Sequence, residues 1–418
     1  RRMNKLQASI YPLHYAWIIV AISTLVVFAA LGLARFGYSS LLPPMQVSLG
    51  MNNTQAGIMA TFNLIGYLTL SVIGGALAAR YGPRVVITVG LALVGVAMLF
   101  TGMANTFLSA VLWRTVTGVG SGASNVPVMA LVAAWFAARR RGLGSGIAVS
   151  GSSIGLIMIG SLVPQVLSAY GEDGWRISWF IFGITTLILA LVGWLILRND
   201  PKEVDQSPYG LEDPQPGPKA SGTGLQWGRV YRAPAVWHLG LVYIAFGFSY
   251  IIYLTFFIKR LIAEVGYTQE AAGGLFMTMG WFSMLCGLIW GTISDKIGRK
   301  NALILVYLIH ATSFALFAWN GSINLTLSAI LFGLTAWSIP AIMAATCGDV
   351  LGPRLAPAAL GFITLFFGIG QALGPSVAGA MADSASSLIP AYLLASGVAL
   401  LGAFGTLFLR PPSTARNN

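Results

Sequence analysis

The chain has 418 residues, of which 56% are hydrophobic and only 9% are charged. In soluble proteins about a quarter of the residues are charged, so this composition excludes a water-soluble globular protein. The formal net charge is +12, from 24 Lys and Arg residues against 12 Asp and Glu residues. These basic residues lie mostly between long apolar stretches, so they indicate membrane orientation rather than nucleic-acid binding.

Apolar stretches long enough to cross about 30 Å of hydrocarbon, at about 1.5 Å per residue, run through the whole chain. We count twelve, at residues 14–43, 54–79, 83–103, 107–136, 142–168, 175–197, 235–258, 268–293, 300–319, 325–348, 356–381 and 388–409. We therefore predict an all-α membrane protein with twelve transmembrane helices. The first stretch is too long for a signal-peptide core and no small-residue cleavage pattern follows it, so we expect it in the mature protein.

The basic residues are distributed unevenly between the two sides of this arrangement. One side holds 19 of the 24, namely Arg1, Arg2, Lys5, Arg80, Arg84, Arg139, Arg140, Arg141, Arg198, Lys202, Lys219, Arg229, Arg232, Lys296, Arg299, Lys300, Arg354, Arg410 and Arg416. Arg176, Lys259 and Arg260 fall on the other side, and Arg35 and Arg114 lie within spans. Because loops rich in Lys and Arg stay in the cytoplasm, we predict that both termini are cytoplasmic.

The first span contains Arg35, beyond its middle. An arginine there costs about 3 kcal/mol on insertion scales, so it needs a partner or a water-filled cavity. All twelve acidic residues, from Glu172 to Asp383, fall in predicted loops or at helix ends. We therefore expect the missing counterion to be a bound ligand, a small organic anion held by the planar guanidinium. The alternative is that Arg35 binds backbone carbonyls or extends towards the outer interface.

Ten other residues near the middle of their spans are candidates to line a substrate cavity. They are Tyr38, Asn63, Tyr67, Asn125, Ser153, Tyr250, Tyr253, Trp281, Trp337 and Gln371. For each, the alternative is ordinary packing of an aromatic ring, or a hydrogen bond that joins two helices.

Arg114 opens a small-residue pattern in the fourth span, with Gly118, Gly120 and Gly122 after it. The glycines allow neighbouring helices to approach closely. For Arg114 itself, a structural role, in which it binds neighbouring backbone carbonyls or extends outward, stands beside a substrate or coupling role.

Residues 198–233 form the one extended polar stretch, rich in proline, glycine and charge, which we predict to be a cytoplasmic linker with a short helix near Trp227 and Tyr231. It separates an N-terminal six-helix half, residues 1–197, from a C-terminal half, residues 234–418. The halves align at an offset of 216 positions, which pairs Gly82 with Gly298. Two six-helix halves in the same orientation form a parallel repeat, and the substrate site is expected between them.

A short basic hairpin joins the second and third spans of each half. In the first half it contains Arg80, Gly82 and Arg84, and in the second Gly291, Asp295, Lys296, Gly298, Arg299 and Lys300. The glycines Gly82 and Gly298 permit a tight turn, and the basic side chains can bind the carbonyls of neighbouring helix ends.

The two hairpins resemble the loop motif of the major facilitator superfamily, G-x-x-x-D-[RK]-x-G-R-[RK]. The second copy matches every position, whereas the first has Ala79 and Pro83 in place of the acid and the arginine. The resemblance implies the major facilitator fold and a secondary transporter that works by alternating access. It also implies a conformational latch at the cytoplasmic side, formed by Asp295 and the basic residues around it.

Two further stretches, Leu33 to Pro43 and Gly348 to Pro357, resemble a bacterial branch of the superfamily with poorly defined substrates. Asn199, Asp200 and Pro201 are similar to a segment of the monocarboxylate and oxalate/formate exchangers. These resemblances imply a transporter in the inner membrane of a bacterium, in contact with the lipid bilayer, and the small organic anion expected at Arg35 is then its substrate. We expect the transporter to be a monomer.

Other functions remain open or are excluded. A drug exporter of the same superfamily is the main alternative, and a membrane sensor that does not transport is a further one. We expect no enzyme activity, cofactor or metal, because the sequence has no catalytic constellation and Cys286 and Cys347 are isolated. The sequence offers no buried carboxylate to carry a proton, so coupled protons would move with the anion or through His310, for which we favour a packing role.

Overall fold

The computed structural model describes residues 14–211, 227–351 and 355–409, and within these ranges the regular elements are all helices. Several basic residues assigned above to the cytoplasmic side lie outside the described residues: Arg1, Arg2, Lys5, Lys219, Arg354, Arg410 and Arg416. The short helix expected after the linker is present at Trp227–Tyr231.

The described residues 14–211 form eleven helical segments, the last of them within the predicted linker. They are α1 (Tyr15–Val27), η1 (Phe28–Phe36), α2 (Gly37–Leu49), α3 (Asn53–Tyr81), α4 (Pro83–Gly102), α5 (Phe107–Trp135), η2 (Ala138–Arg140), α6 (Arg141–Tyr170), η3 (Gly171–Asp173), α7 (Gly174–Ile196) and η4 (Pro201–Val204).

The described residues 227–351 and 355–409 form nine helices, the first of them within the predicted linker. They are α8 (Trp227–Tyr231), α9 (Pro234–Ala263), α10 (Gln269–Ser283), α11 (Cys286–Ile297), α12 (Arg299–Ala318), α13 (Ser322–Thr335), α14 (Ser338–Leu351), α15 (Ala356–Ala385) and α16 (Ile389–Leu407). Two expected spans are each interrupted, one between α10 and α11 and the other between α13 and α14.

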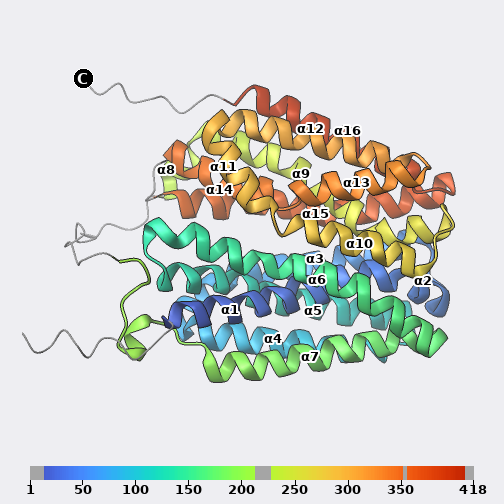
Figure 1. The fold of residues 1–418 in the computed structure, drawn as a ribbon, viewed down its shortest axis with the longest axis horizontal. Helices are drawn as coiled ribbons and strands as arrows, with labels where there is room; N and C mark the ends of the chain where they lie inside the picture. Colours follow the sequence, from blue (N-terminus) through green and yellow to red (C-terminus); the bar gives the residue numbers. More distant parts are fainter. Residues whose placement is uncertain (1–13, 212–226, 352–354, 410–418) are drawn as a thin grey trace, which may run out of the picture.

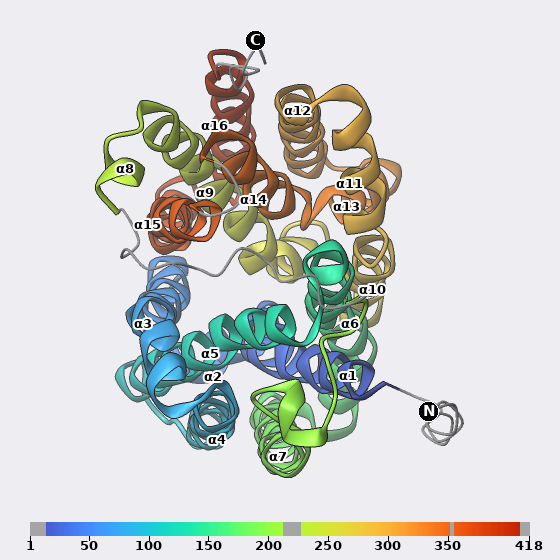
Figure 2. The same ribbon diagram turned by 90° about the vertical axis from the view of Figure 1, so that its left-hand side faces the viewer.

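The two halves pack side by side as separate bundles, the first below and the second above in Figure 1. Helices α3 and α6 of the first half contact α15 and α10 of the second, respectively, and both contacts are visible in the end-on view of Figure 2. We call the end that carries the α3–α4 turn and α8 the linker end, and the opposite end, with the α2–α3 and α15–α16 turns, the far end.

Among the described residues, nine helical stretches have the length and hydropathy of membrane spans, or ten if the bent α3 is counted as one. One of the nine, Arg141–Ile196, contains both α6 and α7. Every one of the twelve expected spans falls on a single helix or on consecutive helices. The all-helical membrane architecture is therefore confirmed, and the number of twelve crossings stays a prediction.

The two hairpin turns have nearly the same backbone conformation. Gly82 has φ 85° and ψ 141°, and Gly298 has φ 86° and ψ 149°. Each glycine ends one helix and begins the next without an intervening loop. Because a side chain is strained at such a positive φ, glycine is required at both turns.

Glycines also set how closely the helices of each half approach. A Cβ atom at Gly118 would lie 1.9 Å from the carbonyl oxygen of Asn63, and one at Gly122 would lie 2.2 Å from that of Tyr67. Helices α3 and α5 therefore pack backbone against backbone, which fixes the position of Asn63 and Tyr67. In the second half, a Cβ atom at Gly370 would lie 2.4 Å from the carbonyl oxygen of Ile244, so α9 and α15 pack in the same way.

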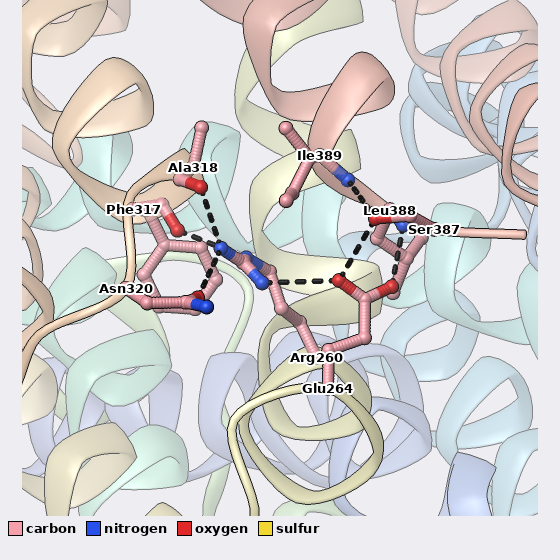
Figure 3. Close-up of polar contacts among 8 residues, drawn as sticks. All are labelled: Arg260, Glu264, Phe317, Ala318, Asn320, Ser387, Leu388 and Ile389. Atoms are coloured by element: carbon pink, nitrogen blue, oxygen red, sulfur yellow. Dashed lines mark hydrogen bonds and ion pairs between the residues drawn. The ribbon is translucent and has the colours of Figure 1, made fainter. Parts of the chain in front are cut away.

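At the far end of the second half, Arg260 is fully buried and joins three helices (Figure 3). Its guanidinium donates to the carbonyl oxygens of Phe317 at 2.9 Å and Ala318 at 2.7 Å, where α12 ends, and pairs with Glu264 at 3.0 Å. The Glu264 carboxylate in turn accepts from the backbone N–H of Leu388, next to the start of α16. Cations at helix C-termini and anions at N-termini are both favourable, so this network ties α9, α12 and α16 into one unit.

Candidate functional site

The first span is a continuous helix whose middle is a π-helix, η1, and Arg35 lies in its last turn. At its end the backbone N–H of Gly37 bonds to the carbonyl of Gly32, five residues earlier. The π-helical geometry is rare and occurs frequently at functional sites, because it displaces a side chain from the regular helical position. Arg35 is thus presented from an irregular segment of an otherwise regular helix.

The Arg35 guanidinium is half-buried and faces residues of both halves. Its carbon Cζ lies 4.3 Å from the ring centroid of Tyr67 on α3, a cation–π contact. It also interacts with the Tyr250 hydroxyl on α9, in the second half. Its Nε and Nη2 atoms are buried and have no hydrogen-bond partner. Two donors of a charged group are therefore available to an acceptor.

Two amide side chains hold the tyrosines beside Arg35. Asn125 on α5 donates to the Tyr67 hydroxyl at 3.0 Å, and Gln371 on α15 donates to the Tyr250 hydroxyl. Arg35 is one of the eleven candidate binding residues, and four of the others lie together with it: Tyr67, Asn125, Tyr250 and Gln371. They come from α3, α5, α9 and α15, so the group spans the interface between the halves.

Arg114 lies close to Arg35 and is buried, with only 1% of its surface exposed. Its Nη1 donates to the carbonyl oxygen of Ala34, and its Cζ lies 5.1 Å from the Tyr38 ring and 4.9 Å from the Trp179 ring. The backbone-binding role that we considered for Arg114 is therefore present in the structure. Its Nε atom, however, is buried without a partner.

A cavity of about 20 Å³ lies between Arg35 and Arg114, which is room for one water molecule. Its lining residues are Arg35, Phe36, Tyr38, Ser39, Ala60, Asn63, Leu64, Arg114, Ile251, Leu254 and Thr255. Ile251, Leu254 and Thr255 belong to the second half, so the volume of the cavity depends on how the two halves are positioned relative to each other. Both charged residues in the lining are arginines, and no Asp or Glu belongs to it.

Ser153 on α6 lies where the helix interruptions of the second half meet the first half. It accepts a hydrogen bond from Ser283 at 2.7 Å, next to the α10–α11 interruption, and one from the Trp337 indole at 3.1 Å, in the α13–α14 interruption. The Trp337 ring also stacks on Phe36, with centroids 5.6 Å apart. Two broken helices and the π-helix therefore converge near the cavity, as interrupted helices do at transporter substrate sites.

Two candidate residues lie away from Arg35. Tyr253 is buried in the aromatic core of the second half and bonds to Ser328 at 2.8 Å, and the Trp281 side chain is 57% exposed on α10. Asn63 and Tyr38 line the cavity but are engaged: the amide of Asn63 donates to the carbonyl of Arg114 at 2.7 Å, and the Tyr38 hydroxyl donates to that of Ala56 at 2.9 Å.

His310 lies in the core of the second half. It is fully buried and stacks on Phe246 and Phe332, with ring centroids 5.7 and 5.3 Å away. This aromatic surrounding agrees with the packing role.

The second hairpin makes its ion pairs within its own half. Arg299 pairs with Asp295 at 2.6 Å and with Asp349 on α14 at 3.4 Å. The first hairpin has no acid at the matching position, and there Arg84 donates to the carbonyl oxygen of Trp194 at 2.8 Å. The hairpin charges thus bind neighbouring helices of the same half in this conformation.

The sequence analysis missed two polar contacts between the halves at the far end. The Asp383 carboxylate on α15 accepts from the backbone N–H groups of Asn53 and Thr54 at 3.0 and 2.7 Å, at the start of α3. Lys259 on α9 donates to the side chains of Gln46 and Asn53. The signal was present, because Asn52, Asn53 and Thr54 are typical helix N-cap residues, and anions bind at such ends.

A family model described as the Major Facilitator Superfamily matches the chain at residues 24–319 and 257–418. The chain belongs to this superfamily. It is accordingly a membrane transport protein and not an enzyme, as the hairpin motif implied.

Curated relatives within the superfamily are similar over nearly their whole length. The chain is 25% identical to a probable sulfoacetate transporter of Cupriavidus necator, covering 90% of both chains. It is also 25% identical to a hexuronate transporter of Bacillus subtilis, covering 91% of both. A putative tartrate transporter of Agrobacterium vitis is 22% identical over 97% of this chain and 92% of its own.

Solved structures with the same fold include the nucleoside transporter NupG, with a TM-score of 0.72 at 15% identity, covering 95% of this chain and 99% of that one. Another is an inward-facing bacterial homologue of the human lysosomal transporter Spinster, with a TM-score of 0.70 at 17% identity, covering 94% and 95%. These likenesses confirm the fold.

Proposed function

We propose that this major facilitator transports a small organic anion by alternating access, and that the anion pairs with Arg35. The observation that carries the proposal is the Arg35 guanidinium, which lies at the interface of the halves with two unpartnered donors. A charged group in this position is costly unless it is paired, so a transported anion would supply the missing counterion.

The arrangement of the group supports movement around the anion. Arg35 and Tyr67 belong to the first half, whereas Tyr250 and Gln371 belong to the second, so a bound anion would contact both. Rocking of the halves about the α3–α15 and α6–α10 contacts would then open the site to alternate sides. The names of the relatives support an anion, because sulfoacetate, hexuronate and tartrate are all organic anions.

Replacement of Arg35 tests the proposal. In proteoliposomes that contain the purified protein, we expect Arg35→Gln to abolish uptake of the organic anions that the wild type transports, and Arg35→Lys to retain part of it, because lysine keeps the charge without the bidentate fork. The matched control is Arg232→Gln, which removes an exposed arginine at the linker end. Unchanged uptake by a folded Arg35→Gln protein would contradict the proposal.

A drug exporter is the second candidate, and one observation favours it. Tyr243, Phe246, Tyr250 and Phe367 form a largely buried stack of rings on α9 and α15, and this stack reaches Arg35 at Tyr250. A lipophilic cation such as tetraphenylphosphonium separates the two functions. An exporter of such compounds would bind it, whereas a site built around Arg35 would repel it.

A further inference from the structure

Two arginines, rather than one, line the cavity at the proposed anion site. Arg35 and Arg114 both belong to the lining, and they are near enough for their like charges to repel each other. Each has at least one buried donor with no partner: Nε and Nη2 of Arg35, and Nε of Arg114. A single cationic group would need one negative charge, whereas this cavity holds two positive charges.

The protein itself does not balance these charges. No Asp or Glu is among the described residues that line the cavity, and Glu264 and Asp383 are engaged elsewhere, with Arg260 and with the start of α3. Arg114 obtains one backbone carbonyl and two aromatic faces, which fix its direction but supply no full charge. Placing two uncompensated guanidiniums together in a low-dielectric site is strongly unfavourable, so a ligand with two charges gains more there than one with a single charge.

Each of the two arginines has its own set of neighbours. Arg114 is held by Ala34, Tyr38 and Trp179, whereas Arg35 stacks on Tyr67 and interacts with Tyr250. The lining of the cavity also contains Asn63, Thr255 and Ser39, whose buried hydroxyl oxygen has no partner, among apolar side chains such as Leu64 and Ile251.

We propose that the transported anion is a small dianion with two carboxylate or sulfonate groups, one bound by Arg35 and the other by Arg114. This proposal rests on the proposed function and makes Arg114 the residue that selects dianions over monoanions. A hydroxyl or other polar group between the two acids would face Ser39 and Asn63.

Matched ligands that differ by one charge test the selectivity. Succinate is compared with succinamate, and sulfoacetate with its carboxamide, at a pH where both acidic groups of the dianions are ionised. Binding to the full-length purified protein is measured by calorimetry and by ligand-induced thermal shift. We expect the wild type to bind at least one dianion about tenfold or more tightly than its amide, which corresponds to about 1.4 kcal/mol.

Variants of Arg114 and Arg35 test which arginine is responsible for the preference for dianions. Arg114→Gln should lower the affinity for the dianion to that for the amide and leave the amide unchanged, whereas Arg114→Lys should retain the preference. Arg35→Gln should abolish binding of both ligands. If Arg114→Gln does not fold, the wild-type comparison and the lysine variant still decide the question.

The outcomes separate the two proposals. If the wild type binds the amides as tightly as the dianions and Arg35→Gln abolishes both, the dianion proposal is wrong and the anion function stands. If Arg114→Gln keeps the full preference for dianions, Arg114 is not the selecting residue and the proposal is likewise wrong. If neither ligand class binds and Arg35→Gln changes nothing, the proposed function itself fails.

Discussion

The partner of Arg35 in this structure is an aromatic ring rather than an acidic side chain. Its guanidinium lies 4.3 Å from the Tyr67 ring centroid, and such a contact is worth about 0.5 to 2 kcal/mol, most when water is excluded. This is less than the cost of a buried charge, so the contact orients the guanidinium without satisfying it. An arginine that is positioned but unsatisfied is well suited to bind and release an anion.

Two substitutions of Tyr67 distinguish the contribution of its ring from that of its hydroxyl. We expect Tyr67→Leu to raise the KM for anion uptake several-fold, because the guanidinium loses its cation–π contact and gains freedom. Tyr67→Phe keeps the ring and loses only the hydrogen bond from Asn125, so its KM should stay close to that of the wild type. Initial uptake rates in proteoliposomes measure both values, and equal effects of the two substitutions would show that the ring does not orient Arg35.

At the scale of single residues, the sequence suggested candidates for the site but did not indicate which of them lie together. Arg35 stood out because a charge in an apolar stretch is visible without a structure. Tyr250 and Tyr253 were equal candidates, yet only Tyr250 lies beside Arg35, whereas Tyr253 packs inside the second half. Helix α9 is apolar on every side, so its sequence has no polar stripe that would indicate which face meets the other half.

At the scale of the elements, departures from regular α-helix gather around the cavity. The π-helix η1 carries Arg35, and Arg114 binds the carbonyl of Ala34 within it. The interruptions of the two broken spans in the second half meet at Ser153. No single-sequence pattern marked these irregularities, because each depends on a partner from another helix.

The close packing of the regular helices, by contrast, depends on glycines that are visible in the sequence. We expect Gly118→Ala to destabilise the protein by about 1 to 3 kcal/mol or more, because a Cβ atom would lie 1.9 Å from the Asn63 carbonyl oxygen and push α5 away from α3. Gly75→Ala is the matched control on α3, since a Cβ atom there meets nothing within 4 Å. Thermal unfolding in detergent measures the difference, and equal midpoints for the two variants would contradict the close packing of α3 on α5.

At the scale of the whole molecule, the described residues include several polar contacts that cross between the halves. Thr61 donates to the carbonyl of Ala372 at 2.7 Å, Lys259 reaches Gln46, and Asp383 binds the start of α3. The contacts of Lys259 and Asp383 join the two halves at the far end in this structure, so we expect them to keep that end closed. The basic hairpins, which the sequence identified, stabilise each half separately at the linker end.

Asp383 provides a direct test of this closure. Its carboxylate accepts two backbone N–H bonds and the Thr54 hydroxyl at the N-terminus of α3, across the interface. We expect Asp383→Asn to weaken the closed far end by about 1 kcal/mol, because the substitution removes a negative charge from a helix N-terminus. A shift of this size changes the ratio of closed to open molecules several-fold.

Double electron–electron resonance between spin labels measures that ratio. The labels are placed at Val47→Cys on α2 and Glu270→Cys on α10, both exposed at the far end, after the buried Cys286 and Cys347 are replaced by serine. Asp383→Asn should increase the population with long distances, whereas Ser384→Ala, which removes a hydroxyl bound only within α15, should not. An unchanged distance distribution in Asp383→Asn would mean that the apolar packing of α3 on α15, rather than the carboxylate, keeps the far end closed.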